Sequence, residues 1–313
     1  MRRAIELARH GELDASPNPM VGAVITDSRG NIIGEGWHRR CGEGHAEVNA
    51  VRSVADPSLL KDSTIYVTLE PCAHYGKTPP CAKLIADMKI PRVVVGCVDP
   101  FAKVSGRGIA MLREAGAEVM VGMLEKECRD INPKFFTAHT LRRPYITLKW
   151  AESSDGFIDG HISTPLTAVA VHKLRATHDA ILVGSGTWAA DSPRLDTRLF
   201  AGKSPLRFIA DRSGKADSLP DGITILSDTS DLQKTLNSLY EEKNITSLLV
   251  EGGSRLLQSF LDEGLFDVIR IERSPRFIEG KVKAPVLPSG LRLDSCIKMD
   301  GNTIMEYSRP KLT

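Results

Sequence analysis

The sequence predicts an α/β protein built from two domains. Stretches rich in Val, Ile and Leu alternate along the chain with amphipathic stretches, which is the pattern of strands joined through helices. With 313 residues, the chain is long for one domain. The pattern also begins again after Arg142-Arg143-Pro144. We therefore place a boundary there, which gives domains at residues 1–142 and 143–313.

The first domain is expected to contain a partly parallel sheet with helices on its faces. A helix at residues 4–10 precedes a hairpin at residues 20–38, whose turn is formed by Ser28-Arg29-Gly30-Asn31. Proline is typical of a helix start and glycine of a helix end, so Pro79-Pro80 and Gly116 mark two further boundaries. The remaining elements are predicted in this order: a helix from His45 to residue 55, strand 63–69, helix 79–88, strand 92–98, helix 108–116, strand 117–122 and helix 124–136.

The second domain is also expected to be α/β. Its strands are predicted from residue 145 and at 179–186, 205–211, 222–227, 247–253 and 266–275, and its helices at 166–177, 230–240 and 253–262. Two of these strands run directly into glycine turns, at Gly184-Ser185-Gly186 and at Gly252-Gly253. Most such turns are only tight turns, but their backbone N–H groups can also bind phosphate. The pair is compatible with a cofactor cleft.

The composition argues for an enzyme that acts on a small molecule. The chain has 41 basic and 39 acidic side chains and a formal net charge of +2, so it offers no basic surface for nucleic acid or for a membrane. No run approaches the ~18 apolar residues of a membrane span, and the N-terminus lacks the apolar core of a signal peptide. A cytoplasmic location is therefore expected. The sequence leaves open whether the chain forms a homo-oligomer.

The segment LEPCAHYGKTPPC, residues 69–81, contains two cysteines separated by eight residues. Taken alone, Cys72 and Cys81 could form a disulfide, bind a metal or be unrelated core thiols. Six cysteines in a long chain with an expected cytoplasmic location argue against a disulfide framework. His45, at the start of a predicted helix, supplies a third soft ligand. One His and two Cys form a set suited to Zn²⁺, with a fourth position left open for water.

Glu47 lies two residues after His45 and gives the predicted metal site a catalytic purpose. A carboxylate beside an open zinc position can take a proton from water and pass it to a leaving amine, as in hydrolytic deamination. The signature of that chemistry is H-x-E followed by P-C and a second Cys, usually two residues on rather than eight. H-x-E alone is most often a solvated helix start, but its combination with EPC and PPC favours a catalytic zinc site. Cys41, Cys97 and Cys128 lack such neighbours and are interpreted as structural.

Eight segments together resemble those of a known family. They are SPNPMVGAVI, HAEVNA, YVTLEPCAHYGKTPPC, VDPF, PYITLKWAESSDG, VHKLRATHDAILVGSGTWAADSPRLDTR, PLRFIADRSG and LLVEGGSRLLQSFL. The first four resemble the deaminase domain, and the last four the reductase domain, of bifunctional riboflavin-biosynthesis deaminase/reductases. The resemblance implies a cytidine-deaminase-like three-layer domain followed by a dihydrofolate-reductase-like domain. It also implies zinc-dependent removal of the 2-amino group from a diaminopyrimidinone that carries a phosphoribosylamino arm, and then NADPH-dependent reduction of that ribosyl arm to ribityl.

The resemblance assigns roles within the first domain. His45, Cys72 and Cys81 would bind Zn²⁺, and Glu47 would move the proton. The positions that match substrate contacts are Asn18, His38, His74 and Lys77. The charge of Lys77 suits a phosphate, although a loop lysine is as often only solvated.

The resemblance also assigns positions in the second domain. Those that match the NADPH site are Ala151, Thr187, Asp191, Gly253, Ser254, Arg255, Leu256, Leu257, Gln258 and Ser259. Those that match the substrate site are Arg175, Leu195, Arg198 and Glu251. The guanidinium groups of Arg175 and Arg198 suit a phosphate. We further hypothesise that Arg212, which follows a predicted strand, meets the 2′-phosphate of NADPH.

One segment departs from the family pattern. The loop after Gly156 is several residues shorter than in many members. Phe157 stands where Lys or Arg is frequent, and His161 stands where a Trp would align. The substrate contacts of the reductase domain are therefore expected to differ in this loop.

Three other functions remain open. A nucleic-acid base deaminase with an appended domain would share the zinc chemistry, but the balanced charge and the lack of basic, aromatic-rich stretches disfavour it. A zinc-stabilised binding protein would have no use for Glu47 beside an open zinc position. The third alternative keeps the deaminase and makes the second domain only structural. Oxidation of NADPH in the presence of the deaminated substrate would exclude that alternative.

Overall fold

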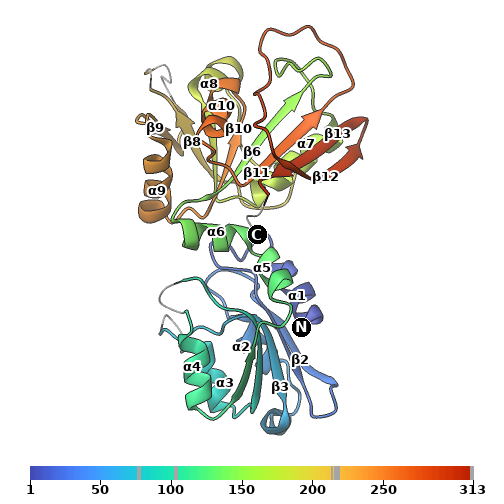
Figure 1. The fold of residues 1–313 in the computed structure, drawn as a ribbon, viewed down its shortest axis with the longest axis vertical. Helices are drawn as coiled ribbons and strands as arrows, with labels where there is room; N and C mark the ends of the chain where they lie inside the picture. The colour runs from blue at the N-terminus through green and yellow to red at the C-terminus, as the bar shows by residue number, and fades with distance from the viewer. Residues whose placement is uncertain (76–78, 102–104, 213, 215–218, 311–313) are drawn as a thin grey trace. The chain divides into compact units, whose positions relative to one another are not determined.

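Two separate β-sheets organise the structure, one in each half of the chain (Figure 1). The computed structural model describes residues 1–75, 79–101, 105–212, 214 and 219–310. By its internal contacts the chain divides into two units, Met1–Leu141 and Arg142–Thr313. Each unit has its own sheet and its own hydrophobic core.

The first unit contains a mixed sheet of five strands. The strands are β1 (Gly22–Thr26), β2 (Ile32–Trp37), β3 (Thr64–Leu69), β4 (Arg92–Cys97) and β5 (Glu118–Val121). The helices are α1 (Arg2–Ala8), α2 (Ala46–Arg52), α3 (Cys81–Asp87), α4 (Arg107–Glu114), α5 (Glu125–Asp130) and α6 (Pro133–Leu141), with 3-10 helices η1 (Arg9–Gly11) and η2 (Pro57–Asp62). The strand order is β2-β1-β3-β4-β5. β1 pairs antiparallel with β2 and β3, whereas β3, β4 and β5 run parallel.

Helices cover both faces of this sheet, so the first unit has three layers. On one face, Ala50 of α2, Ile85 of α3 and Leu112 of α4 are fully buried in one cluster with the strands. On the other face, α1 and α6 contribute Ile5 and Phe135 to a second cluster. The parallel strands of this mixed sheet need apolar cover on both faces, and the alternation of strands and helices in the sequence supplies it.

The helix predicted at residues 124–136 is interrupted between α5 and α6. Pro133 has no N–H to donate, so it cannot continue the hydrogen-bond ladder of α5 and instead occupies the first position of α6. The side chain of Asn132 bonds the backbone N–H and C=O of Met20, at 2.7 Å and 2.8 Å. The prediction of one continuous helix is wrong here, because the proline outweighs the apolar periodicity.

The second unit contains an eight-stranded sheet. Its strands are β6 (Tyr145–Glu152), β7 (Ala180–Gly184), β8 (Leu206–Ala210), β9 (Ile223–Leu226), β10 (Ser247–Glu251), β11 (Val268–Arg273), β12 (Arg292–Met299) and β13 (Asn302–Ser308). Its helices are α7 (Pro165–Ala176), α8 (Ser185–Asp191), α9 (Leu232–Lys243) and α10 (Ser254–Asp262). The order is β12-β13-β11-β6-β10-β7-β8-β9. The six strands from β11 to β9 in that order run parallel, and β12 and β13 form an antiparallel hairpin at the edge.

Alternating residues of one central strand face two different cores in this unit. Leu248 and Val250 of β10 pack with the cluster that includes α9 and α10. Leu249, between them, belongs to the opposite cluster, where Leu174 of α7 and Trp188 of α8 also pack. Successive strand residues point to opposite faces, so this alternation shows that the second sheet is also covered on both sides.

The sequence analysis did not predict α8, β12 or β13. The Gly184-Ser185-Gly186 segment, which was interpreted only as a glycine turn, begins α8. The edge hairpin turns at Asp300 and Gly301, which both have positive φ angles of 50° and 85°. Asp-Gly between two extended runs is a strong hairpin signal, so this hairpin could have been found from the sequence.

The parallel strands place their carboxyl ends at one edge of the second sheet. β6, β7, β8 and β10 run parallel to their neighbours, so the loops that follow them lie along the same edge. In parallel α/β sheets, ligands bind in the crevice outside the carboxyl ends of the strands. The two glycine turns singled out in the sequence follow β7 and β10, and so lie at this edge.

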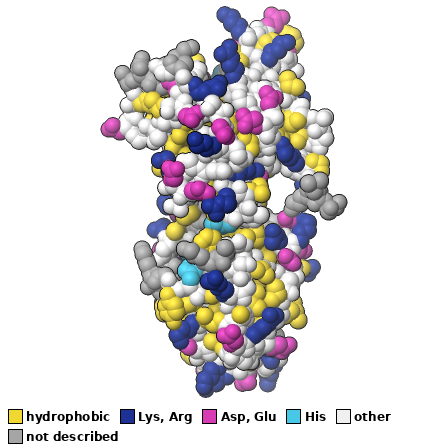
Figure 2. All heavy atoms as spheres, turned by 60° about the vertical axis from the view of Figure 1, so that its left-hand side comes forward, with side chains coloured by type: hydrophobic (Ala, Val, Ile, Leu, Met, Phe, Trp, Pro, Cys, Tyr) yellow, Lys and Arg dark blue, Asp and Glu magenta, His cyan; other side chains and the backbone are white. Residues whose placement is uncertain are grey.

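The surface carries both signs of charge. On the face shown in Figure 2, Lys and Arg side chains are interspersed with Asp and Glu side chains over the described residues of both units. This distribution follows the near balance of 41 basic and 39 acidic residues. None of the helices in the described part of the chain combines the length and apolar character needed to cross a lipid bilayer.

Candidate functional site

Three predicted metal ligands meet in the first unit. His45 is the N-cap residue of α2, Cys81 is the first residue of α3, and Cys72 follows β3. The Nδ1 atom of His45 lies 3.3 Å from Sγ of Cys81 and 3.7 Å from Sγ of Cys72. Within the residues that the structure describes, these three form the one group of three or more His, Cys, Asp or Glu that could hold a metal ion, and their ligand atoms lie within 4.8 Å of one another.

The donor set fits a zinc ion. The backbone N–H of Cys81, at the N-terminus of α3, points to Sγ of Cys72 at 3.3 Å, and a helix N-terminus favours a thiolate. Hydrogen bonds from Cys81 and His45 lower the pKa of Cys72 to about 4. One imidazole and two sulfurs, one of them readily deprotonated, are the ligands that zinc takes in the hydrolytic deaminases.

Glu47 lies beside the three ligands in a dry environment. It belongs to the first turn of α2, and its side chain is only 3% exposed. Burial raises the pKa of Glu47 to about 7, against an opposing effect from His45. Glu47 is not part of the three-ligand group, so its carboxyl group is available for proton transfer.

Glu70 has a structural task that the sequence analysis missed. Its buried carboxylate accepts hydrogen bonds from the N–H groups of Asp99 at 3.3 Å, Gly106 at 3.0 Å and Gly108 at 2.9 Å. The bonds tie the loop after β4 and the start of α4 to the end of β3, two residues before Cys72. The Glu of the EPC motif therefore positions the cysteine rather than binding the metal.

Asn18 and His38 lie next to the metal ligands. Asn18 Nδ2 is 3.1 Å from His38 Nε2, and the ring of His38 meets that of His45 edge-on at 5.2 Å. His38 Nδ1 is 3.3 Å from the carbonyl oxygen of Gly44, which can only accept, so the proton is assigned to Nδ1. Burial lowers the pKa of His38, which favours this neutral form. Asn18 then donates to Nε2.

The remaining predicted residues of the first unit are less enclosed. His74 is exposed, and Lys77 lies outside the described residues.

Asp99, at the end of β4, was not singled out in the sequence. It is 7% exposed, burial raises its pKa to about 6, and its side chain accepts from the N–H of Phe101 at 2.8 Å. The sequence feature that could have indicated Asp99 is the Asp-Pro pair directly after a buried strand.

A large cleft of about 1640 Å³ occupies the second unit at the carboxyl ends of β6, β7, β8 and β10. Its lining contains most of the predicted cofactor positions. The predicted residues that line it are Ala151, Thr187, Asp191, Arg212, Glu251, Gly253, Ser254, Arg255, Leu256 and Ser259. The cleft therefore brings together residues from four segments that are distant in the sequence.

The glycine turn after β10 packs closely against α8. Gly252 has a φ of 79°, and a Cβ there would lie 2.9 Å from Cγ2 of Thr187. A side chain at this position would be strained and would also displace Thr187. The turn thus leaves backbone groups of the cleft uncovered next to the N-terminus of α10, where a phosphate is favoured.

Lys149 is a cleft residue that the sequence analysis missed. It lies on β6, lines the cleft, and is only 9% exposed. Burial lowers the pKa of Lys149, while the nearby carboxylates of Glu251 and Glu272 act in the opposite direction. A lysine inside an apolar strand was the signal, because a buried ammonium group requires acidic partners.

Arg175 and Glu251 form a buried ion pair. The Nε and Nη2 atoms of Arg175 donate to the two carboxylate oxygens of Glu251, at 3.0 Å and 2.7 Å. Burial would raise the pKa of Glu251, but the bonds and charge of Arg175 lower it below its usual value. The guanidinium predicted to bind phosphate is thus already engaged by Glu251, and its Nη1 donates to the carbonyl of Asp196 at 3.2 Å.

Five predicted reductase positions do not line the cleft. Arg175 bonds the lining residue Glu251 without lining the cleft itself, and Leu195 is fully buried. The exposed Arg198 pairs with Asp196 at 2.5 Å. Leu257 packs in the core, and the side chain of Gln258 bonds Asp262. On α10 only the side chains of one helix face reach the cleft, so the run from Gly253 to Ser259 contributes in part.

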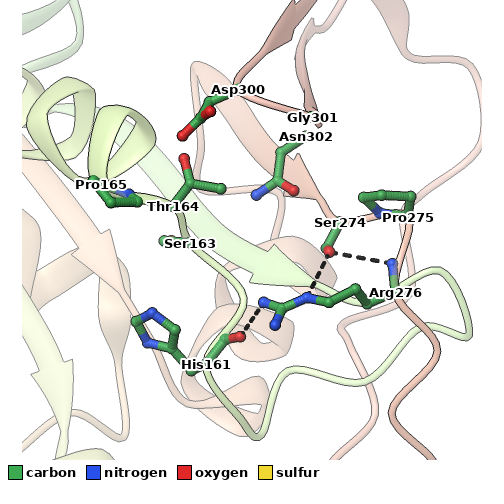
Figure 3. A pocket seen from close by; sticks show the side chains of 10 residues that line it. All are labelled: His161, Ser163, Thr164, Pro165, Ser274, Pro275, Arg276, Asp300, Gly301 and Asn302. Carbon is green, nitrogen blue, oxygen red and sulfur yellow. Dashed lines mark hydrogen bonds between the residues drawn. The ribbon is translucent and has the colours of Figure 1, made fainter.

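A second, smaller pocket of about 400 Å³ adjoins the cleft, and both are lined by His161 and Ser163 (Figure 3). Figure 3 shows the guanidinium of Arg276 reaching the carbonyl oxygen of His161. Ser163 donates to the buried Glu272 at 2.7 Å, and Asn302 donates to the same carboxylate at 2.6 Å. The shortened loop after Gly156 is therefore held in place by β11, β13 and the segment that follows β11.

Two family models match the chain. The model described as the RibD C-terminal domain matches residues 144–309. The model described as the cytidine and deoxycytidylate deaminase zinc-binding region matches residues 1–97, the part that contains His45, Glu47, Cys72 and Cys81.

Curated relatives match nearly the whole chain. The riboflavin biosynthesis protein RibD of Bacillus amyloliquefaciens is 39% identical and covers 93% of this chain and 87% of the relative. The protein of the same name from Aquifex aeolicus is 38% identical and covers 89% of this chain and 86% of the relative.

Solved structures agree over both units. A diaminohydroxyphosphoribosylaminopyrimidine deaminase/5-amino-6-(5-phosphoribosylamino)uracil reductase from Thermotoga maritima matches with a TM-score of 0.88 and 34% identity, covering 99% of this chain and 97% of that chain. RibD of Acinetobacter baumannii matches with a TM-score of 0.87 and 30% identity, covering 99% and 98%. The predicted fold of both units is confirmed by these matches.

Proposed function

This chain belongs to the RibD family of riboflavin biosynthesis proteins, and from that premise we propose which residues carry out its two reactions. The chain is a bifunctional enzyme with a deaminase and a reductase activity, and its cofactors are Zn²⁺ and NADPH. We assign deamination to residues 1–142 and reduction to residues 143–313. The substrate class we propose is that named for the Thermotoga maritima relative, a diaminopyrimidine with a phosphoribosylamino arm.

The observation that supports the deaminase assignment is a buried carboxyl group, Glu47, beside His45, Cys72 and Cys81. These three residues would hold zinc, which supplies the Lewis acidity that makes water a nucleophile near neutral pH. In the proposed reaction water adds to the ring carbon that carries the 2-amino group. Glu47 takes a proton from that water and delivers it to the departing amine, which leaves as ammonia.

The substrate contacts of the deaminase remain proposals. Asn18 and His38 are hydrogen-bonded to each other beside His45, so the pair can present a fixed polar edge to a pyrimidine. We retain His74 and Lys77 as contacts for the phosphoribosyl arm, on the resemblance described above.

The balanced surface charge favours this small phosphorylated ligand over nucleic acid or a membrane. The cytoplasmic location stays a prediction, and the oligomeric state stays open.

The reductase reaction requires a hydride and a proton. We propose that the hydride adds to C1′ of the ribosyl arm, the bond from C1′ to the ring oxygen breaks, and that oxygen takes up the proton. NADPH supplies the hydride when it is bound in the cleft, so the chain has to supply the proton and the alignment. Lys149 is the proposed proton donor, because it is a buried ammonium group that lines the cleft. Arg212 keeps its proposed role at the 2′-phosphate.

A metal-ligand variant tests the deaminase half. Cys72→Ser is expected to release zinc and to lower the deaminase kcat/KM by roughly 10²-fold or more, because a Lewis acid contributes several kcal/mol. NADPH oxidation with the deaminated substrate should stay within about twofold, since the proposed reductase residues all belong to the other unit. Zinc content by atomic absorption and both activities are measured. Cys41→Ser, at an exposed cysteine, is the control. Full deaminase activity in Cys72→Ser would refute the assignment.

A lysine variant tests the reductase half. Lys149→Met is expected to lower kcat for NADPH oxidation by about 10²-fold, the lower range for loss of a positioned proton donor. Lys234→Met, at an exposed lysine of α9, should keep wild-type kcat. Steady-state loss of NADPH absorbance, with NADPH affinity measured separately by fluorescence, gives both quantities. Wild-type turnover in Lys149→Met would remove it from the mechanism, and no turnover in the wild-type protein would exclude the reductase activity itself.

A further inference from the structure

The segment between β11 and β12 forms an outer wall of the reductase cleft. We call residues 276–286 the strap. Three of its residues, Lys281, Val282 and Lys283, line the cleft together with Phe157 and Asp159 of the loop after β6. In Figure 1 both segments are irregular coils beyond the ends of β6 and β11. Segments with no regular structure need other interactions to hold a fixed position.

Two aspartates of the loop after β6 hold the backbone of the strap. Asp155 accepts hydrogen bonds from the N–H groups of Ile278 and Glu279, at 3.2 Å and 2.9 Å. Asp159 accepts from the N–H groups of Lys281 and Val282, at 2.6 Å and 2.8 Å. The latter two bonds lower the pKa of Asp159, so its carboxylate is ionised near neutral pH and the bonds are charge-assisted.

The loop and the strap also pair through their backbones. The N–H of Ile158 donates to the carbonyl of Val282 at 2.9 Å, and the N–H of Ala284 donates to the carbonyl of Gly156 at 2.8 Å. A Cβ at Gly280 would lie 2.4 Å from Oδ1 of Asp159, so only glycine permits this close approach. The two segments therefore act as one short ribbon.

Both ends of the strap are anchored as well. At its start, the guanidinium of Arg276 donates to the carbonyl oxygens of His161 and Ile162, the contact drawn for His161 in Figure 3. At its end, the N–H of Val286 donates to Oε1 of Gln258 on α10 at 2.8 Å. The strap is thus tied to the helix whose first turn lines the cleft with Ser254 and Arg255.

The strap brings two positive charges to the cleft. Within the described residues, neither Lys281 nor Lys283 forms an ion pair within 4.0 Å. Arg212 and Arg255 also line the cleft without an ion pair in that part of the chain. Together with the buried Lys149, these four residues give the cleft five cationic side chains, which suit a ligand with several phosphate groups because charge-assisted bonds to phosphate are the strong ones.

We propose that Lys281 and Lys283 bind a phosphate of NADPH and that Asp155 and Asp159 are positioning residues for these two lysines. The proposal rests on the reductase function proposed above. The substrate also carries a phosphate, but the tie between the strap and α10 favours the cofactor. Asp159 holds the backbone of Lys281 itself, and Asp155 holds the strap at Ile278 and Glu279, just before the lysines.

The test compares affinities for the cofactor. In the full-length protein, the double variant Lys281→Ala/Lys283→Ala is expected to raise the KM for NADPH about 10-fold or more, with kcat within about twofold. Asp159→Ala should raise the same KM, and Asp159→Asn, which keeps one acceptor oxygen, should raise it less. A variant that combines Lys281→Ala/Lys283→Ala with Asp159→Ala should raise the KM for NADPH by less than the product of the two separate increases. The reason is that lysines on a displaced strap no longer contribute to binding. Lys234→Ala/Lys298→Ala, at two exposed lysines, is the matched control.

Further measurements separate the sources of phosphate. An equal rise of the KM for NADPH and NADH supports contact with the diphosphate, and a rise for NADPH alone supports contact with the 2′-phosphate. A rise only in the KM for the pyrimidine would overturn the cofactor assignment, and unchanged KM values in all variants would overturn the proposal. The urea unfolding midpoint of each variant, followed by tryptophan fluorescence, reports whether the second unit is folded. If the proposed reductase function itself were wrong, the wild-type protein would not oxidise NADPH. That result differs from unchanged KM values in the variants.

Discussion

Glu47→Gln is expected to lower the deaminase kcat by about 10²–10⁴-fold while zinc stays bound and NADPH oxidation continues. Glutamine has nearly the same shape as glutamate, so it fits the buried site at the start of α2. It cannot take a proton from water and return it to the departing amine. The three metal ligands are untouched, because Glu47 is not part of their group. Chemistry and metal binding should therefore separate in this variant.

The measurement pairs zinc content with single-turnover release of ammonia. Glu114→Gln, at an exposed glutamate at the end of α4, is the control and should keep the wild-type rate. Retained zinc with lost deamination supports a proton-transfer role. Full activity would contradict it, and loss of zinc together with activity would show that Glu47 acts by holding the site together.

Glu251→Ala is expected to destabilise the second unit by about 3–5 kcal/mol, the usual cost of leaving a buried charge without its partner. The side chains of Arg175 and Glu251 are only 12% and 10% exposed, and two hydrogen bonds join them. Urea unfolding followed by tryptophan fluorescence measures the loss, and residual deaminase activity reports the first unit. Glu241→Ala removes the exposed pair between Arg142 and Glu241 in the same unit and should cost less than about 1 kcal/mol. Equal effects of the two variants would contradict this prediction.

A double variant separates the stability of the pair from its function. Arg175→Leu/Glu251→Leu should regain much of the lost stability, because well-packed apolar residues can replace a buried ion pair. It should not regain NADPH oxidation if Glu251, which lines the cleft, contacts the substrate as the resemblance implies. Recovery of activity together with stability would show that the pair is only structural.

The same pair predicts how acid affects the second unit. The folded pKa of Glu251 is lowered from its ordinary value of 4.5 by Arg175. Its stabilising contribution is therefore fully present above about pH 4.5 and is lost as the pH falls through the folded pKa. The double leucine variant should lack this part of the acid dependence, which urea midpoints between about pH 3 and 6 would show.

The zinc centre could be predicted from the sequence because its ligands have local signals. His45 stands at the start of α2, Cys81 at a helix start that Pro79-Pro80 marks, and Cys72 follows a strand. Strand ends and helix starts gather at one edge of a parallel sheet, so the sequence order of these signals is enough to bring the ligands together. The interruption at Pro133 was also visible in the sequence, but the apolar periodicity on both sides of it concealed the break.

The reductase cleft could be predicted only in part. Its glycine turns are local signals, and the structure places both of them at the cleft. The partner of Arg175 lies 76 residues away, and the backbone groups held by Asp159 lie 122 and 123 residues away. No spacing rule connects residues so far apart. Lys149 was missed for the same reason, because its buried charge is stabilised by carboxylates from two other strands, those of Glu251 and Glu272.

By itself, the sequence determined the two-domain α/β architecture and the residues of the zinc centre. Both follow from patterns that extend over a few turns of helix or a few strand residues. Only the tertiary structure decided that Arg175 is engaged by Glu251 and that Lys149 lines the cleft. It also decided that the strap carries to the cleft wall two lysines that form no ion pair with the described residues. Burial and ion pairing depend on which distant segments meet, and that is settled when the sheets assemble and their loops gather at one edge.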